Sequence, residues 1–303
     1  MSTLVDTASK FLPSFVKTRL VQSQIVNNMT ANRLAVSSKR LDLCAAQIAH
    51  VLHLSDLAGS HPLKGKTCLE IGSGWVLSHS LIFYLLGARK VISTDIQRIA
   101  HPHALQRALH ASVASVVRDV LSPFEDHCEI RDRISHLLGI KRITFLELEK
   151  LGIVYVAPVD LAKNHLGIST DFVFSNVVLQ SVPKGDVQPL LSNLAYDLSN
   201  GGIMIHCIHL EDIAGIESNP FGFYSEPESA FTRDVQSRRG NRIRKSQWLE
   251  TISGIDDLDC QIIFQSERKD KDLPRIIDPS IQYTDMSDLL TTHLGLLVTK
   301  KQD

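Results

Sequence analysis

The sequence predicts an α/β protein with a doubly wound, mostly parallel sheet of seven strands, a helical cap at the N-terminus and an antiparallel strand pair at the C-terminus. Two observations lead to this prediction. Short apolar runs typical of buried strands alternate with helical patterns between residues 66 and 209. The first of these runs ends in the glycine turn LEIGSGW, where the chain must pass sharply from a strand to a helix.

The totals are those of an ordinary globular chain. Hydrophobic residues make up 44% of the 303 residues, charged residues 21%, and the formal net charge is -1, which argues against a disordered or nucleic-acid-coating protein. The five cysteines are scattered without a C-x-x-C pair, so neither a disulfide framework nor a zinc site is predicted. Because no membrane-spanning run or secretion signal is evident, we expect a cytoplasmic location.

Residues 1–60 are predicted to form a helical cap or lid. Helical patterns cover about 8–28 and 37–54, and the second pattern repeats apolar residues at helical spacing behind a serine. Residues 1–40 carry six basic residues against the single acid Asp6. A solvated helix face is the preferred interpretation of this charge, and a weak contact with a membrane surface, or a transit peptide, is the alternative.

Residues 61–303 are predicted to form the main domain, with 211–250 as an insertion on the substrate side. Its expected elements are strand 66–72, helix 76–86, strand 89–95, helix 101–117, a helical insertion at 122–138, strands 153–158 and 171–177, helix 186–199 and strand 202–209. A loop-rich, charged segment then runs to about 245, followed by helix 246–253 and strands 260–267 and 293–299.

The glycine turn and an acid one strand later suggest a nucleoside site. Gly72-Ser73-Gly74 presents bare backbone N–H groups just before a helix, and glycine permits a close ligand approach there. Asp95 ends the next apolar strand, the position at which an acid accepts hydrogen bonds from ribose hydroxyls in doubly wound folds.

At these residues, together with Glu70, Asp160 after the strand IVYVAP, and the segment DFVFSNVVLQSV…LLSNLAYDLSNGGIMIH, the chain resembles the class I S-adenosylmethionine-dependent methyltransferases. The resemblance covers about 64–210 and, at NRIRKSQWL, extends to a bacterial subgroup with a G-S/T-G-W turn. It implies a Rossmann-like methyltransferase fold with S-adenosylmethionine as cofactor, and a set of cofactor-binding residues: Glu70, Gly72, Ser73, Gly74, Asp95, Ile96, Asp160, Leu161 and Asn176.

The sequence departs from the family pattern in two places. Val76 stands where a third glycine is common, and Gln180-Ser181 stands where many relatives carry Glu-His, so no general base is implied there. A nicotinamide dinucleotide is the rival ligand, but its G-x-G-x-x-G fingerprint would need glycine at Leu77. A NAD(P)-dependent oxidoreductase and a non-catalytic partner or scaffold subunit with the same fold are the alternatives to an enzyme that transfers methyl groups.

The acceptor is expected beyond the carboxyl ends of the fourth and fifth strands. His209 and Asp212 are the candidate catalytic residues after the fifth strand, although positioning alone can supply much of the rate. Gln180, Arg242 and Arg244 are the expected substrate contacts, the two arginines because guanidinium groups suit a phosphate or carboxylate.

The expected substrate is therefore an oxygen or nitrogen nucleophile of a small molecule or glycan-type precursor. No third ligand is spaced for a metal beside His101 and His103, so no metal is predicted. Aromatic residues are only 6% of the chain and do not interleave with the basic run, which argues against nucleic acid as a partner.

Overall fold

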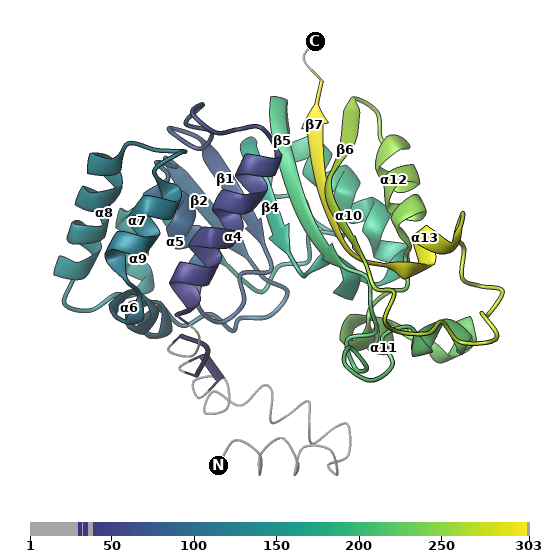
Figure 1. The fold of residues 1–303 in the computed structure, drawn as a ribbon. Helices are drawn as coiled ribbons and strands as arrows, with labels where there is room; N and C mark the ends of the chain where they lie inside the picture. Colours follow the sequence, from purple (N-terminus) through teal and green to yellow (C-terminus); the bar gives the residue numbers. More distant parts are fainter. Residues whose placement is uncertain (1–29, 32, 36–38, 302–303) are drawn as a thin grey trace.

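The computed structural model describes residues 30, 31, 33–35 and 39–301. They contain one seven-stranded sheet in the order β3-β2-β1-β4-β5-β7-β6 (Figure 1). Its strands are β1 (Thr67–Ile71), β2 (Lys90–Thr94), β3 (Ile153–Val156), β4 (Thr170–Asn176), β5 (Leu198–His209), β6 (Leu258–Glu267) and β7 (Thr291–Lys300). Strands β1 to β5 pair in parallel, and β7 is antiparallel to both β5 and β6. The predicted fold class is confirmed, including its C-terminal antiparallel pair.

The helices follow the predicted order with four differences. They are α4 (Arg40–Leu54), α5 (Ser78–Leu85), α6 (Pro102–Ala111), α7 (Ala114–Leu121), α8 (His127–Gly139), α9 (Phe145–Lys150), α10 (Lys184–Asp197), α11 (Arg233–Arg239), α12 (Lys245–Ser253) and α13 (Met286–Leu290). The predicted helix 101–117 is broken at Ser112, whose backbone is extended, and Asp42 of α4 accepts the next N–H, from Val113, at 3.2 Å. Helices α9, α11 and α13 were not predicted.

The two faces of the sheet are covered by different helices. Cys68, Val91 and Phe172 point to the face packed by α4 to α9, while Leu69, Ile92 and Val173 point to the face packed by α10 and α12. This split follows from the two-residue alternation of side chains along a strand. It places odd and even positions of β1 in different cores, so Glu70 points to the same face as Cys68.

The described part of the predicted cap, α4, packs directly on α5 and α7, and its first residues lie at the lower edge of the sheet in Figure 1. The predicted helix 8–28 and most of the basic segment 1–40 lie outside the described residues. Residues 211–250 contribute to a small core of their own, formed by Phe221, Phe223, Tyr224, Phe231, Ile281 and Leu289. Along the described ranges, no helix is both long and apolar enough to cross a membrane.

Candidate functional site

A cavity of about 320 Å³ opens at the carboxyl edge of the sheet, where ligands bind in open α/β folds. Three segments line it: the turn after β1 with the start of α5, the residues that follow β4, and the N-terminal helical region. The lining residues are Leu34, Arg40, Gly72, Ser73, Gly74, Trp75, Val76, Leu77, Ser78, His79, Asn176, Val177 and Val178. The predicted glycine turn therefore forms a wall of a real cavity.

Backbone conformation around this cavity depends on glycine. Gly72 and Gly74 have φ values of 74° and 59°, which L side chains rarely adopt. A Cβ on Gly72 would overlap Cγ2 of Val178 and lie 3.0 Å from its Cγ1, whereas a Cβ on Gly74 would meet nothing within 4 Å. Val177, at φ 55°, is a β-branched residue in the same left-handed region. This strained residue carries the chain into Val178, which packs over the turn.

Asp95 lies against the glycine turn, as the nucleoside interpretation requires. Its Oδ2 accepts the N–H of Gly74 at 3.2 Å and its Oδ1 accepts the N–H of Gln97 at 2.9 Å. Burial raises the pKa of Asp95, an effect that these two backbone N–H groups oppose. Because the hydroxyl of Tyr155 accepts the N–H groups of Ile99 and Ala100, the loop that carries Asp95 is fixed to β3.

Glu70 is not placed to face a cofactor. Strand alternation points its carboxylate into the core under α4 and α5, where it is 1% exposed. It accepts hydrogen bonds from Ser80 and, at 2.8 Å, from Ser93, and its Oε1 lies 3.1 Å from Nδ1 of His79. Its predicted role as a cofactor-binding residue is corrected to a buried structural role beside the cavity.

His79 links Glu70 to the cavity wall and to α4. Its Nε2 lies 3.4 Å from Oε1 of Gln47, whose amide also bonds the predicted site residue Asn176, with Nε2 to Oδ1 at 2.6 Å. Burial alone would lower the pKa of His79, but the neighbouring Cys44 thiol and Glu70 raise it to about 9. The same pairing holds the pKa of Cys44 below its ordinary value in spite of burial. Any positive charge on the His79 ring is paired with the carboxylate of Glu70, so this pair adds no net charge to the cavity wall.

One end of the cavity is suited to an anion. The N-terminus of α5 has no side-chain cap, so its first N–H groups and the positive end of the helix dipole are available. Arg40 lines the same cavity and makes no hydrogen bond or ion pair with any residue in the described ranges. Ser78 Oγ and Trp75 Nε1 are buried, and neither has a hydrogen-bond partner among the described residues. The thiol of Cys44 is a polar neighbour of the Ser78 hydroxyl. Such orphaned groups indicate a missing ligand.

The sequence missed Arg40, Gln47 and His79 because they belong to the site only through packing. Arg40 and Gln47 lie on α4, far from the glycine turn along the chain, and no motif marks them. Periodicity did carry one signal: His79 occupies a position in the apolar run VLSHSLIFYLL that is otherwise typical of core residues. A titratable residue at such a position needs a buried partner, and Glu70 is that partner.

The remaining predicted cofactor residues lie outside the cavity, beyond Asp95. Ile96 is 66% exposed, while Leu161 is buried in the core beneath α10. Asp160 accepts the N–H of Ala162 at 3.1 Å, and its ion pair with Lys163 at 2.8 Å lowers its pKa. The backbone N–H of Val159 donates to the carbonyl of Asp95 at 2.9 Å. Because Val159 directly precedes Asp160, the predicted residues Asp95 and Asp160 lie on neighbouring segments.

The predicted catalytic residues after β5 are each engaged by a neighbouring side chain. Asp212 is 4% exposed and binds the guanidinium group of Arg239 through both carboxylate oxygens. His209 Nε2 lies 2.6 Å from Oε2 of Glu211. Gln180, a predicted substrate contact, is buried with its Oε1 unpaired among the described residues.

Arg242 and Arg244 are buried structural residues, which corrects their predicted role as substrate contacts. Arg242 is 6% exposed, donates to the carbonyls of Phe223 and Glu226, and pairs with Glu228. Arg244 is fully buried; it donates to Leu210 O at 2.8 Å and Thr291 O at 2.7 Å, and to the Tyr224 hydroxyl. Neither guanidinium group can reach a ligand without breaking these bonds.

Arg244→Met is expected to lower the free energy of unfolding by about 2–4 kcal/mol, because two buried carbonyls and a hydroxyl lose their donor. Chemical denaturation measures this change. Arg238→Met, at an exposed arginine of α11, is the matched control and should change stability by less than about 0.5 kcal/mol. An Arg244→Met protein as stable as the wild type would restore the substrate-contact interpretation.

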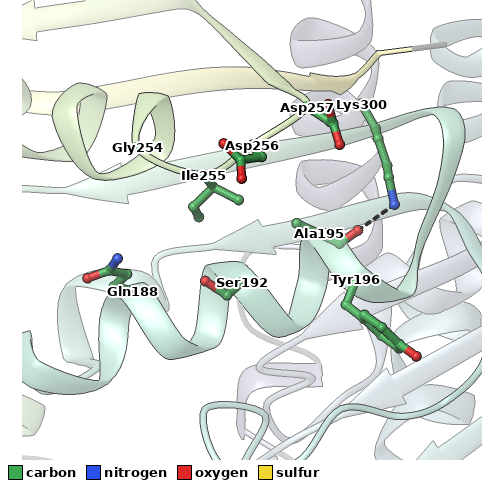
Figure 2. Close-up of a pocket in the computed structure, with 9 residues that line it drawn as sticks. All are labelled: Gln188, Ser192, Ala195, Tyr196, Gly254, Ile255, Asp256, Asp257 and Lys300. Atoms are coloured by element: carbon green, nitrogen blue, oxygen red, sulfur yellow. Dashed lines mark hydrogen bonds between the residues drawn. The ribbon is translucent and has the colours of Figure 1, made fainter. Parts of the chain in front are cut away.

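A second cavity, of about 380 Å³, lies at the opposite edge of the sheet, between the end of α10 and the turn before β6 (Figure 2). Its one cation, Lys300 in Figure 2, already donates to the carbonyls of Ala195 and Leu198 at 2.8 Å. Its position at the amino ends of the parallel strands is not where α/β folds bind substrates. The smaller cavity, with its unpaired buried atoms, is therefore the candidate functional site.

No family model and no curated protein matches this sequence. Among solved structures, the chain is similar to an O-methyltransferase family protein from Burkholderia thailandensis, at 11% identity and a TM-score of 0.47 over 95% of this chain and 63% of that one. It is also similar to the CurJ carbon methyltransferase, at 14% identity and a TM-score of 0.45 over 93% of this chain and 61% of that one. The N-methyltransferase NodS from Bradyrhizobium japonicum WM9 is similar at 11% identity and a TM-score of 0.39, over 85% of this chain and 97% of that one. The chain thus spans less than two thirds of the first two proteins.

Proposed function

We propose that this chain is an S-adenosylmethionine-dependent methyltransferase that acts on an oxygen or nitrogen nucleophile of a small molecule or glycan-type precursor. The observation that carries the proposal is the contact between Asp95 and the N–H of Gly74, because it sets the acid that is predicted to bind the ribose against the glycine turn. The sheet order supports it as well. An antiparallel β7 between β5 and β6 departs from the 3-2-1-4-5-6 order of the dinucleotide-binding fold.

The residues present fit this cofactor along its length. Arg40 and the uncapped start of α5 would hold the carboxylate of its methionine part. The open space around Gly74 leaves room for the ligand, Asp95 would accept the ribose hydroxyls, and the exposed side chain of Ile96 would cover the adenine ring. When bound, the cofactor supplies a sulfonium methyl group that is open to in-line displacement.

The chain itself contributes mainly positioning. Asp212 and His209 are engaged with Arg239 and Glu211, so neither is a free base in this arrangement. Holding nucleophile and methyl group in line can contribute roughly 7–11 kcal/mol in favourable cases. Gln180 stays a predicted acceptor contact, but it is 2% exposed, so its unpaired Oε1 would reach an acceptor only if the chain around it moved.

Transfer of a labelled methyl group from S-adenosylmethionine into a metabolite or cell-wall precursor extract tests the activity. We expect a labelled product whose methyl group is bound to oxygen or nitrogen. Cofactor binding without transfer to any component would favour the non-catalytic partner, and binding of NAD in place of S-adenosylmethionine would favour an oxidoreductase.

Arg40→Gln is expected to weaken S-adenosylhomocysteine binding by about 1–2 kcal/mol, or roughly five- to thirtyfold, because a charge-assisted hydrogen bond to the carboxylate is lost. Methylthioadenosine lacks that carboxylate, so its affinity should not change. Titration calorimetry with both ligands measures the difference, with Arg107→Gln, at an exposed arginine of α6, as the control. Equal losses for the two ligands would show that Arg40 does not bind the carboxylate.

A further inference from the structure

Three side chains that the proposed cofactor site does not use gather at one edge of the sheet, at the carboxyl end of β5 and the amino end of β7. The antiparallel register sets His209 directly opposite His293, and their rings stack with centroids 4.7 Å apart. Glu211 follows β5 and turns its Oε2 to within 2.6 Å of His209 Nε2. One ligand atom from each of the three lies within 4.8 Å of the others.

Arg268 fixes the carboxylate of this cluster. Its Nη1 donates to Oε1 of Glu211 at 2.8 Å and to the carbonyl of Ile216 at 2.6 Å, which leaves Oε2 directed at His209. The charge of Arg268 is shared with the exposed carboxylate of Asp270, 3.3 Å from its Nε. An outer partner that orients a ligating carboxylate in this way is typical of metal centres.

Both imidazoles are accessible to an ion from the surface side. His293 is exposed, and His209 is largely buried behind it. Partial burial, with the nearby His209 and Arg268, lowers the pKa of His293. Neutral imidazole nitrogens and an ionised carboxylate are the protonation states that metal ligation needs.

We propose that His209, Glu211 and His293 form a binding site for one divalent transition-metal ion. Two imidazole nitrogens and one carboxylate oxygen suit Zn²⁺, Fe²⁺, Co²⁺ or Mn²⁺ better than Mg²⁺ or Ca²⁺, which prefer oxygen ligands. Metal–ligand bonds of about 2.0–2.2 Å place neighbouring ligand atoms about 3.4 Å apart. His209 and Glu211 therefore separate slightly when an ion replaces the proton between them, and the exposed ring of His293 turns toward it.

The place of the site gives the ion a role, which rests on the proposed function. Asn176 at the end of β4 pairs with Cys207 of β5, so the Cα of His209 lies about 8 Å from that of Asn176 at the same edge. An ion there would bind an acceptor oxygen and lower the pKa of its hydroxyl. That would supply the activation which His209 and Asp212, as paired here, do not.

Titration of the chelator-treated full chain with Co²⁺ and Zn²⁺, without S-adenosylmethionine, tests the site. We expect about one ion per chain by calorimetry, visible Co²⁺ absorption bands, and a higher Tm with the ion bound. His209→Ala and His293→Ala should each reduce affinity at least tenfold, because each removes one of three ligands. Glu211→Gln should act in the same direction.

His136→Ala, at an exposed histidine of α8, is the matched control and should bind the ion as the wild type does. Circular dichroism of each variant separates loss of a ligand from loss of the fold. Absence of stoichiometric binding, or binding that survives in both folded histidine variants, would overturn the proposal. Because the titration contains no cofactor, this failure would leave the methyltransferase proposal to its own tests.

Discussion

Gly72→Ala is expected to abolish cofactor binding and to lower the free energy of unfolding by about 2–5 kcal/mol. The loss has two causes: alanine is strained in the left-handed backbone conformation, and its Cβ overpacks against a neighbouring side chain. The residue has φ 74°, and its new Cβ would overlap Cγ2 of Val178. Relief of that overlap would push Val178 away from the turn or the turn into the cavity. Denaturant unfolding and calorimetry with S-adenosylhomocysteine measure the two effects.

Two further variants separate strain from overlap. Gly74→Ala has a similar φ, 59°, but open space around its Cβ, so it should cost only about 1–2 kcal/mol of stability. The double variant Gly72→Ala/Val178→Ala should recover the part of the loss that comes from overlap. If Gly72→Ala proves as stable as Gly74→Ala and still binds the ligand, the close packing of Val178 on the turn has no role in the site.

Asp95→Ala is expected to weaken binding of S-adenosylhomocysteine by about 1–3 kcal/mol, because hydrogen bonds from the ribose to an ionised carboxylate are lost. Asp95 also accepts the N–H of Gly74, so the unfolding free energy of the variant must be measured alongside its affinity. Asp119→Ala, at an exposed acid of α7, is the control. An affinity equal to that of the wild type would place the ribose elsewhere.

Much of the fold could be predicted because it is encoded locally. Buried parallel strands are near-continuous apolar runs, and the glycine turn marks where β1 passes into α5. The short helices α9 and α11 have few residues over which a period can show. The break at Ser112 was missed for a different reason: it depends on Asp42, on a distant helix, which accepts the N–H of Val113.

The site was predictable on one side only. Gly72, Gly74 and Asp95 follow strand ends, where the fold itself dictates proximity. The wall formed by Arg40, Gln47 and His79 depends on how α4 packs, which no local pattern records.

The basic run misled for a related reason. Arg244 in a charged segment reads as a solvated or ligand-binding residue, but its partners are carbonyls of Leu210 and Thr291, distant along the chain. The histidine cluster follows the same logic, since strand pairing brings His293 to His209 across 84 residues of sequence. Ligand spacing along the chain could not indicate it.

The most direct test of the account is titration calorimetry of the wild-type chain with S-adenosylmethionine and S-adenosylhomocysteine, beside NAD. If the turn at Gly72–Gly74 and the carboxylate of Asp95 hold one adenosyl ligand, both sulfur nucleosides bind at one site per chain and NAD does not. Binding of NAD with no measurable heat from either sulfur nucleoside would contradict the account.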